Sequence, residues 1–225
     1  MKSLFNLDNP FMQALARIGD LMMLSILTLA LCIPVVTFGP AAAALFKTVY
    51  SLTQDTCGAV LPAYFRAFRS NFRQALAVGL AMLAALAAFV CDFMLLKLFF
   101  AGTAYTVLVC LVVALALLTL SLTAYLFPLI TRYHNTLSEH LRNAAILMIV
   151  NFPKTVLMVL INLSPVIMFL LRPDFMLQTL VVWIFLAPGL IAQGDSYILA
   201  PVFQSLENAG EEPAEAAEAA EEEEA

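Results

Sequence analysis

Charged side chains are scarce in this sequence: they make up 12% of its 225 residues, against about 25% in an average soluble domain. Hydrophobic residues make up 63%, and long stretches of the chain contain no charge at all. A fold in water would have to expose much of this apolar surface, which is unfavourable. The scarcity of charge therefore excludes a water-soluble globular domain.

Cysteine is also rare, and its spacing predicts neither a disulfide framework nor a metal site. The four cysteines, Cys32, Cys57, Cys91 and Cys110, form no CxxC pair. Within an apolar run a free thiol packs as a small hydrophobic side chain. Leu31 precedes Cys32, whereas a lipid-modification site has a small residue before its cysteine. We therefore expect free cysteines without a lipid anchor.

Catalytic motifs are missing from the sequence, which contains no GxSxG elbow, P-loop or dinucleotide-binding fingerprint. His134, Glu139 and His140 come nearest to a metal site. The two histidines are six residues apart, which places them on different faces of a helix, so we expect these residues at a loop surface. The sequence predicts a protein that is not an enzyme and has no cofactor or metal.

Apolar runs are what the sequence has in abundance, and each is near the ~20 residues needed to cross a bilayer. They cover residues 21–46, 75–91, 98–130, 155–171 and 175–194. The first is not typical of a cleaved signal peptide, because Asp8 and Asp20 precede it and it contains Pro34, Gly39 and Pro40. We predict an all-α fold, a polytopic transmembrane helix bundle with amphipathic interfacial elbow helices.

The basic residues predict the topology of these spans, because short cytoplasmic loops carry an excess of Lys and Arg. Two connectors are rich in cations, and two short turns carry one cation each. The connectors hold Lys47, Arg66, Arg69 and Arg73, and then Arg132, Arg142 and Lys154, while the turns hold Lys97 and Arg172. We expect both connectors to be cytoplasmic and both turns to be external.

The number of crossings depends on the first run, which is long enough to turn within the membrane. Gly39-Pro40 favours a helix restart, because proline fits the first helical turn and disfavours helical geometry in the residue before it. A restart here gives six spans with both termini inside, and a continuous run gives five with the N-terminus outside. We favour six, with residues 40–54 forming either a full crossing or a re-entrant half-span.

Residues 61–75 are the most patterned polar segment. Aromatic and basic side chains form adjacent stripes at helical spacing, which are Phe65, Phe68 and Phe72, and Arg66, Arg69 and Arg73. The pattern is typical of an interfacial helix, with rings in the acyl boundary and guanidinium groups at lipid phosphates. The alternative is a dedicated partner or lipid-signalling site. Residues 137–154 form a similar connector and residues 9–13 a fainter one, which suggests a unit of one elbow helix and two spans used three times.

Polar groups within the apolar runs are few, and in a membrane such groups are commonly paired or functional. Asp92 is followed five residues later by Lys97, so we expect the two to pair or to lie at the external interface, with a substrate or proton site as the alternative. Asn162 precedes Pro165 in the fourth run. We expect Asn162 to bond between helices, with the carbonyl freed near Pro165 as its partner, and ligand binding as the alternative.

Two local patterns predict contacts. Arg17 and Asp20 have the i, i+3 spacing of a surface ion pair at the cytoplasmic edge of the first span. The second run carries two stripes of small residues, Ala77, Ala81 and Ala85, and Ala84 and Ala88. Because small side chains let helix backbones approach, we expect this span to be a packing hub, with homodimerisation as the alternative.

The acidic residues are concentrated at the C-terminus, where residues 207–225 hold nine of the sixteen. The rest of the chain therefore has eleven basic residues against seven acidic ones (16 − 9). We divide the chain into a transmembrane helical domain, residues 1–206, and an acidic Ala/Glu-rich tail, residues 207–225. The tail is expected to be disordered or a frayed helix in the cytoplasm, either simply solvated or bound to a basic partner or cation.

Several segments together resemble one known family. They are Phe5-Asn6, Asp8-Asn9-Pro10, Gly19-Asp20, the Ile-Pro-Val-Val-Thr-Phe-Gly of residues 33–39, and the connector of residues 65–75. On these the chain resembles the YesL-like family of small bacterial membrane proteins, a domain of unknown function, over about residues 5–203. The resemblance implies a role in carbohydrate uptake, since members are typically encoded beside carbohydrate importers, and it supplies no catalytic or ligand residue.

The expected function is thus an accessory or regulatory component of carbohydrate uptake in the bacterial plasma membrane. The expected partners are the lipid bilayer and a carbohydrate importer or another membrane protein, and three arginines beside buried aromatic rings predict no nucleic acid. The alternative is a sugar permease in its own right. A permease requires a wet central cavity reached by Asp92, Asn162 or Gln178, whereas an accessory protein has a dry core.

Overall fold

The computed structural model describes the backbone of residues 10–223 and the side chains of residues 11–208. Within that range the chain is helical and contains no strand, which confirms the all-α prediction. The elements are α1 (Pro10–Leu31), the 3-10 turn η1 (Val35–Thr37), α2 (Phe38–Thr53), α3 (Val60–Ser70), α4 (Phe72–Phe99), α5 (Gly102–Arg132), α6 (Leu137–Val150), α7 (Phe152–Leu171), α8 (Pro173–Gln178) and α9 (Leu180–Glu223). Phe5, Asn6, Asp8 and Asn9, which contribute to the family resemblance, lie outside the described residues.

Six of these helices are long and apolar enough to cross a membrane, which agrees with the six-span interpretation. They are Phe11–Leu31, Val35–Thr53, Phe72–Phe99, Gly102–Arg132, Phe152–Leu171 and Leu180–Asn208. The chain turns after Leu31, and α2 begins at Phe38, so Pro40 sits in its first turn as predicted. A single continuous helix through the first run is therefore wrong.

Helix α2 is the most buried of the six and lies at the centre of the bundle. It packs against α1, α3, α4, α5 and α9. Its 16 residues reach about 24 Å, less than the ~30 Å of a hydrocarbon core. Neighbouring helices rather than lipid therefore surround most of this short span.

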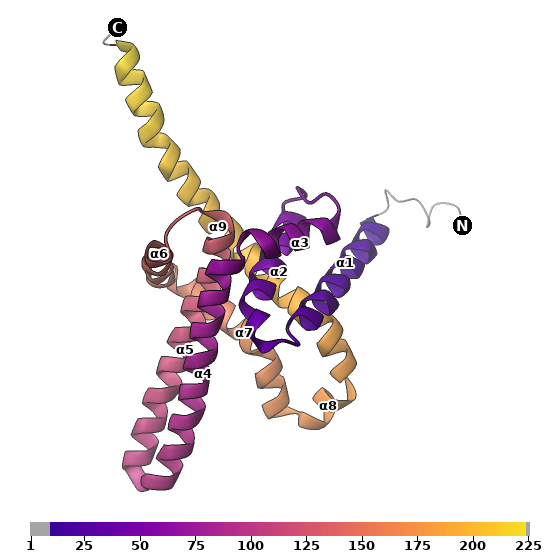
Figure 1. Cartoon of the computed structure of the whole chain (residues 1–225), viewed down its shortest axis with the longest axis vertical. Helices are drawn as coiled ribbons and strands as arrows, with labels where there is room; N and C mark the ends of the chain where they lie inside the picture. Colours follow the sequence, from indigo (N-terminus) through magenta and orange to yellow (C-terminus); the bar gives the residue numbers. More distant parts are fainter. Residues whose placement is uncertain (1–9, 224–225) are drawn as a thin grey trace, which may run out of the picture.

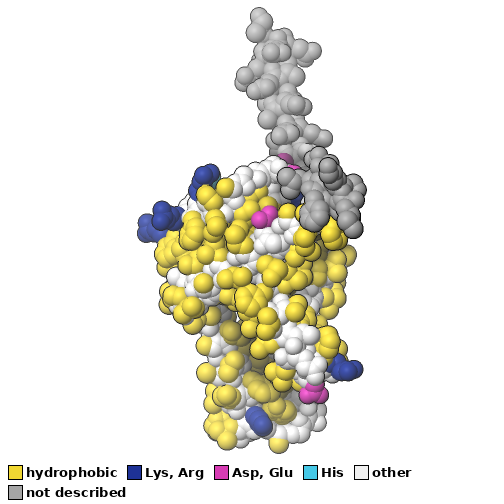
Figure 2. Space-filling model, turned by 90° about the vertical axis from the view of Figure 1, so that its right-hand side faces the viewer, with side chains coloured by type: hydrophobic (Ala, Val, Ile, Leu, Met, Phe, Trp, Pro, Cys, Tyr) yellow, Lys and Arg dark blue, Asp and Glu magenta, His cyan; other side chains and the backbone are white. Residues whose placement is uncertain are grey.

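The elbow helices lie together at one end of the molecule. Figure 1 shows α3, α6, the start of α1 and the late part of α9 toward that end, whereas α8 and the turn between α4 and α5 lie toward the other. Hydrophobic side chains cover much of the face between the two ends, and Lys and Arg are visible mainly near them (Figure 2). We call these the elbow end and the hairpin end. The cation-rich connectors thus lie opposite the two single-cation turns, as the topology requires.

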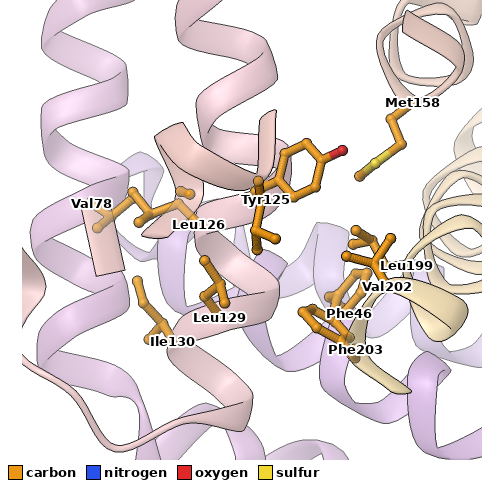
Figure 3. Packing of buried hydrophobic residues seen from close by; sticks show 12 residues of the cluster. Phe46, Val78, Tyr125, Leu126, Leu129, Ile130, Met158, Leu199, Val202 and Phe203 are labelled. Carbon is orange, nitrogen blue, oxygen red and sulfur yellow. The ribbon is translucent and has the colours of Figure 1, made fainter. Parts of the chain in front are cut away.

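The buried core is concentrated toward the elbow end. One cluster joins α2, α4, α5, α6, α7 and α9 around Tyr125, Met158 and Phe203 (Figure 3). A second joins α1, α2, α3 and α9 around Leu24 and Tyr64. Toward the hairpin end, α4 and α5 leave large apolar side chains exposed, and Leu98 is 75% exposed. Lipid can cover such a surface at no hydrophobic penalty, since acyl chains are as apolar as leucine.

Helix α4 does approach its neighbours closely, but through residues other than the predicted alanine stripes. Four of the five alanines are exposed, and only Ala85 is half-buried. The close approach is at Gly79, where an added Cβ would lie 2.6 Å from the Cα of Gly39 in α2. Gly79, together with buried Ala75 one turn earlier, thus forms the close helix contact that we predicted for the alanine stripes.

The acidic tail continues the last span in the structure. Helix α9 runs without a break from Leu180 to Glu223, so it includes the described backbone of the segment that we expected to be disordered or a frayed helix. No change of secondary structure marks the boundary at residue 207. That boundary stays a compositional prediction.

Candidate functional site

The predicted lipid-interface residues lie on α3 and at the start of α4. The three arginines, Arg66, Arg69 and Arg73, and Phe65 are exposed. Phe68 and Phe72 are half-buried and form an edge-on ring pair with centroids 5.5 Å apart. The inward face of α3 is Tyr64 and Ala67, both buried. The structure therefore brings the arginines to the surface and draws two of the three rings partly inward.

Tyr64 attaches the elbow helix to the first two spans. Its hydroxyl donates to the carbonyl oxygen of Ala41 in α2 (3.2 Å) and lies 3.0 Å from the hydroxyl of Thr28 in α1. Burial raises the pKa of Tyr64 to about 12, an effect that the hydrogen bond with Thr28 partly opposes. The phenol thus stays neutral and holds α3 against α1 and α2.

Asn162 makes the interhelical contact that the sequence predicted, but with a different partner. Its amide nitrogen donates to Oδ2 of Asp195 in α9 (2.8 Å) and to the carbonyl oxygen of Met158 in its own helix (2.9 Å). The carbonyl of Ile161, four residues before Pro165, accepts from Ser164 instead. Pro165 thus leaves the carbonyl of Ile161 without its helical donor, and the hydroxyl of Ser164 donates to that carbonyl in place of Asn162.

Asp195 is the residue that sequence reasoning missed. It is only 7% exposed, and its Oδ1 is buried with no hydrogen-bond partner among the described residues. Like Asn162, it lies near the middle of its span, where an ionisable residue is costly and commonly functional. The sequence does contain a signal for it, because the apolar run 175–194 stops at Asp195 but apolar residues resume at Ile198-Leu199-Ala200.

A second polar pair lies between α5 and α7. The hydroxyls of Tyr125 and Thr155 are 2.9 Å apart and buried, and Thr155 also donates to the carbonyl of Asn151 (3.1 Å). Together with Asn162 and Asp195, these groups link α5, α7 and α9 through the core. Such hydrogen bonds between membrane helices each contribute about 0.6 kcal/mol on average.

Asp92 and Lys97 do not form the predicted pair in the described structure. Both are exposed on α4, and the ion pairs of the described residues are Arg17–Asp55 and Arg132–Glu207. Five residues along a helix turn two side chains about 140° apart, which separates the carboxylate from the amine. The placement of the two residues at the external interface, which was the other half of the expectation, stays a prediction.

Arg17 pairs with Asp55 and not with Asp20, so the predicted i, i+3 ion pair is wrong. Its guanidinium donates to Asp55 in the loop after α2 (2.6 Å) and to the carbonyl of Leu52 in the last turn of α2 (3.1 Å). The contact holds the loop after α2 against the start of α1 at the elbow end. Because the side chain of Asp55 is 84% exposed, the pair contributes little to stability.

A cavity of about 490 Å³ opens at the elbow end between α2, α5 and α9. Arg132 lines it, donating from two nitrogens to Oε1 of Glu207 (3.0 and 2.6 Å) and lying over the rings of Tyr50 and Phe203 at 5.0 and 5.1 Å. Lys47 lines the same cavity. Glu207, the first acidic residue of the tail, thus makes a structural contact. Amine, guanidinium and aromatic groups together suit a small polar or anionic ligand.

His140 is buried, not at the loop surface where we expected it. It is 0% exposed on α6, and neither ring nitrogen has a partner among the described residues. Burial lowers its pKa, and the nearby Glu139 carboxylate opposes that effect. Glu139 instead caps α6, since its side chain accepts from the Thr136 backbone (2.8 Å). No group of three His, Cys, Asp or Glu residues in the described chain is placed to hold a metal.

Comparison with known proteins identifies part of this architecture. Over residues 21–93 the chain matches the sequence model of the family described as "Protein of unknown function, DUF624". Over this segment the chain is similar to DUF624. DUF624 contains the YesL-like proteins, so the match confirms the resemblance. No curated protein and no solved structure matches the chain.

The matched segment, residues 21–93, includes the membrane turn at η1, the central helix α2, the elbow α3 and most of α4. It therefore contains the Gly39–Gly79 approach and the three elbow arginines. Asn162, Asp195 and Arg132 lie beyond it. The protein is thus a multi-pass membrane protein whose matched part is the elbow and central helix.

Proposed function

We propose that the protein is a non-enzymatic accessory or regulatory component of carbohydrate uptake in the bacterial plasma membrane. The membrane assignment follows from the six apolar helices. The carbohydrate rests on the resemblance to YesL-like proteins. The observation that carries an accessory role over a transport role is the placement of the cavities, described next.

The cavities that we describe lie away from the middle of the bundle or have apolar walls. Four are at the elbow end, lined by the ends of helices. The fifth, of about 280 Å³ between α7 and α9, is lined mainly by apolar side chains such as Ile161, Trp183 and Leu186. Asp92, Asn162 and Gln178 line none of these five. This packing supports an accessory protein, because a permease binds substrate near the bilayer midplane.

The α4–α5 hairpin offers the surface for a membrane partner. Along the hairpin, Leu86 and Leu118 are 55% and 52% exposed. Figure 1 shows the pair extending well beyond the other helices toward the hairpin end. An importer subunit packing there would exchange lipid for protein along two helices, and a second copy of this chain is the other candidate.

In-membrane photo-crosslinking tests this proposal. A photoreactive residue is placed at Leu86 or Leu118, with exposed Leu170 of α7 as the matched control, in cells grown with and without candidate carbohydrates. We expect hairpin adducts that contain an importer component and no such adduct from Leu170. Adducts with lipid or with a second copy only, from both hairpin positions, would contradict the accessory role.

A sugar permease is the second candidate, and one observation favours it. The buried, unpartnered Oδ1 of Asp195 is the kind of intramembrane carboxylate that transporters use. Uptake of labelled sugar by the purified protein in liposomes would establish this function. Loss of that uptake in Asp195→Asn, with retention in exposed Asp174→Asn, would assign it to the buried carboxylate.

A further inference from the structure

A surface cavity of about 470 Å³ separates the elbow from the loop between α5 and α6. The end of α3, the first residues of α4 and the end of α5 form its walls. The residues that the argument uses are Arg69, Asn71, Arg73, Gln74, Ile130 and His134. The cavity therefore combines the elbow with a loop about sixty residues later in the chain.

The lining is basic and uncompensated. Arg69 and Arg73 contribute two guanidinium groups and His134 an imidazole, and no Asp or Glu lines the cavity. Neither arginine takes part in the ion pairs found among the described residues, which involve Arg17 and Arg132. Guanidinium groups bind phosphate oxygens with two parallel hydrogen bonds. The cavity is therefore suited to an anion with several oxygen atoms.

Hydrogen bonds hold the walls in place. Nε2 of Gln74 donates to the carbonyl of Asn135 across the cavity (3.0 Å), which joins the start of α4 to the α5–α6 loop. Nδ2 of Asn71 donates to the carbonyl of Ala67 (3.2 Å), closing the junction of α3 and α4. Helix α4 begins at Phe72, so the positive end of a 28-residue helix points into the same region. The site is thus preformed on two connected elements.

The cavity lies where lipid headgroups are expected. Phe65 and Phe72 flank the arginines on the elbow, and the two long spans α4 and α5 lead from it toward the hairpin end (Figure 1). Ile130 supplies an apolar wall next to the basic groups. An interfacial helix places its rings at the acyl boundary and its cations at the phosphates. A membrane lipid can reach the cavity without leaving its leaflet.

We propose that this cavity binds the phosphate group of an anionic membrane lipid, with Arg69, Arg73 and His134 as its ligands. The arginines hold the phosphate oxygens, and Ile130 contacts the start of the acyl region. Arg66 belongs to the same stripe but does not line the cavity. The proposal therefore assigns lipid binding to Arg69 and Arg73 and not to Arg66, a distinction that the sequence pattern alone does not make.

Native mass spectrometry of the full chain in detergent, titrated with phosphatidylglycerol or zwitterionic phosphatidylcholine, tests the site. We expect one saturable phosphatidylglycerol with a clear preference over phosphatidylcholine. Arg69→Gln/Arg73→Gln should weaken this binding about tenfold or more, since each cation near a phosphate contributes on the order of a factor of five. Arg66→Gln is the matched control, and we expect less than about a twofold change. His134→Ala, at an exposed side chain, supplies a second test if the double variant does not fold.

Two results would overturn the proposal. Equal losses from Arg66→Gln and Arg69→Gln would show general attraction of lipids to the elbow, not a cavity. Displacement of the lipid by inorganic phosphate at equal concentration would identify the ligand as a free anion. Neither result bears on the importer adducts at Leu86 and Leu118, so this inference and the proposed function fail independently.

Discussion

A hydrogen bond joins Asn162 of α7 to Asp195 of α9 within the bundle. Asp195 accepts one hydrogen bond, from the Asn162 amide, and its other oxygen has no partner among the described residues. A buried carboxylate with no donor at all retains the full penalty of its desolvation. The Asn162 amide is therefore the group that offsets part of this penalty at Asp195.

Asn162→Ala should lower the stability of the detergent-solubilised protein by about 1–3 kcal/mol, because it leaves the Asp195 carboxylate unsatisfied. Ser164→Ala is the control, since that hydroxyl bonds to Ile161 within its own helix. The measurement is the apparent melting temperature. Replacing both Asn162 and Asp195 by leucine should recover part of the loss, and equal melting temperatures for the two single variants would refute the argument.

His140 makes stability depend on pH. Its pKa is lowered in the folded protein, first by burial, so the unfolded chain takes up a proton at about pH 6.5 while the folded chain does not yet do so. Where the unfolded state binds more protons, stability falls as the pH falls. Neutral imidazole is thus the form that α6 requires.

We therefore expect the melting temperature to fall between about pH 7 and pH 5, and to fall less in His140→Phe. Leu141→Phe is the control, because Leu141 is an exposed side chain of the same helix and its replacement removes no titratable group. The comparison uses the same detergent and salt at each pH. Identical slopes for wild type and His140→Phe would assign the pH dependence to other groups.

At the scale of the helices, glycines decide where spans cross. A Cβ on Gly39 would overlap the carbonyl oxygen of Ala75 and lie 2.8 Å from the Cα of Gly79. A Cβ on Gly189 of α9 would lie 2.8 Å from the carbonyl oxygen of Leu21 in α1. All three of these neighbours are backbone atoms of other helices, which cannot rotate away. The central helix α2 thus fits against α4 only without a side chain at residue 39.

Gly39→Ala should destabilise the protein by about 1–3 kcal/mol, because overpacking forces α2 and α4 apart. Gly19→Ala is the matched control: Gly19 lies inside α1 with nothing within 4 Å of an added Cβ. That change should stabilise by about 0.5–1 kcal/mol, since alanine favours a helix. Opposite shifts in melting temperature are the expected result, and a neutral Gly39→Ala would contradict the tight crossing.

The elements also bear on the proposed repeat of one elbow and two spans. Helix α3 precedes α4 and α5, and helix α6 precedes α7 and α9, with short α8 in the second hairpin. The first pair differs, because α1 extends back to Pro10 without a separate elbow in the described chain. The unit thus occurs twice in full.

For the whole molecule, the arrangement of elbows and turns makes a prediction about sidedness. Cys57 lies between α2 and α3 at the elbow end and is half-exposed, and Ala101 lies in the exposed turn between α4 and α5 at the hairpin end. Cation-rich connectors are retained in the cytoplasm. The two positions should therefore be on opposite sides of the membrane.

In intact cells, a membrane-impermeant maleimide should label Ala101→Cys and leave Cys57 unlabelled until the cells are opened. Each variant keeps a single cysteine: one retains Cys57, the other carries Ala101→Cys, and every other cysteine is replaced by serine or alanine. Burial raises the pKa of the Cys57 thiol, and nearby Asp20 raises it further, so labelling is carried out at about pH 8.5, where more thiolate is present. Labelling of Cys57 in intact cells would show that the elbow end faces outward and would contradict the proposed topology.

Local composition was sufficient to derive the membrane class, the six spans, the turn near Pro40 and the amphipathic elbow before any contact was known. Hydropathy and charge act through the solvent, so each stretch of sequence responds to the bilayer largely by itself. The same local reasoning did not identify Asp195 as an intramembrane residue. Taken alone, its charge indicates the end of a span, and only the neighbouring helix α7 supplies its partner, Asn162.

The partners of individual side chains depended on the tertiary structure. Arg17 binds Asp55 and not Asp20, Asn162 binds Asp195 and not a carbonyl near Pro165, and Gly79 rather than an alanine meets α2. Each choice follows from how far a helix is rotated about its axis and where it crosses its neighbour. Those quantities arise from the simultaneous packing of many side chains, which no single segment contains.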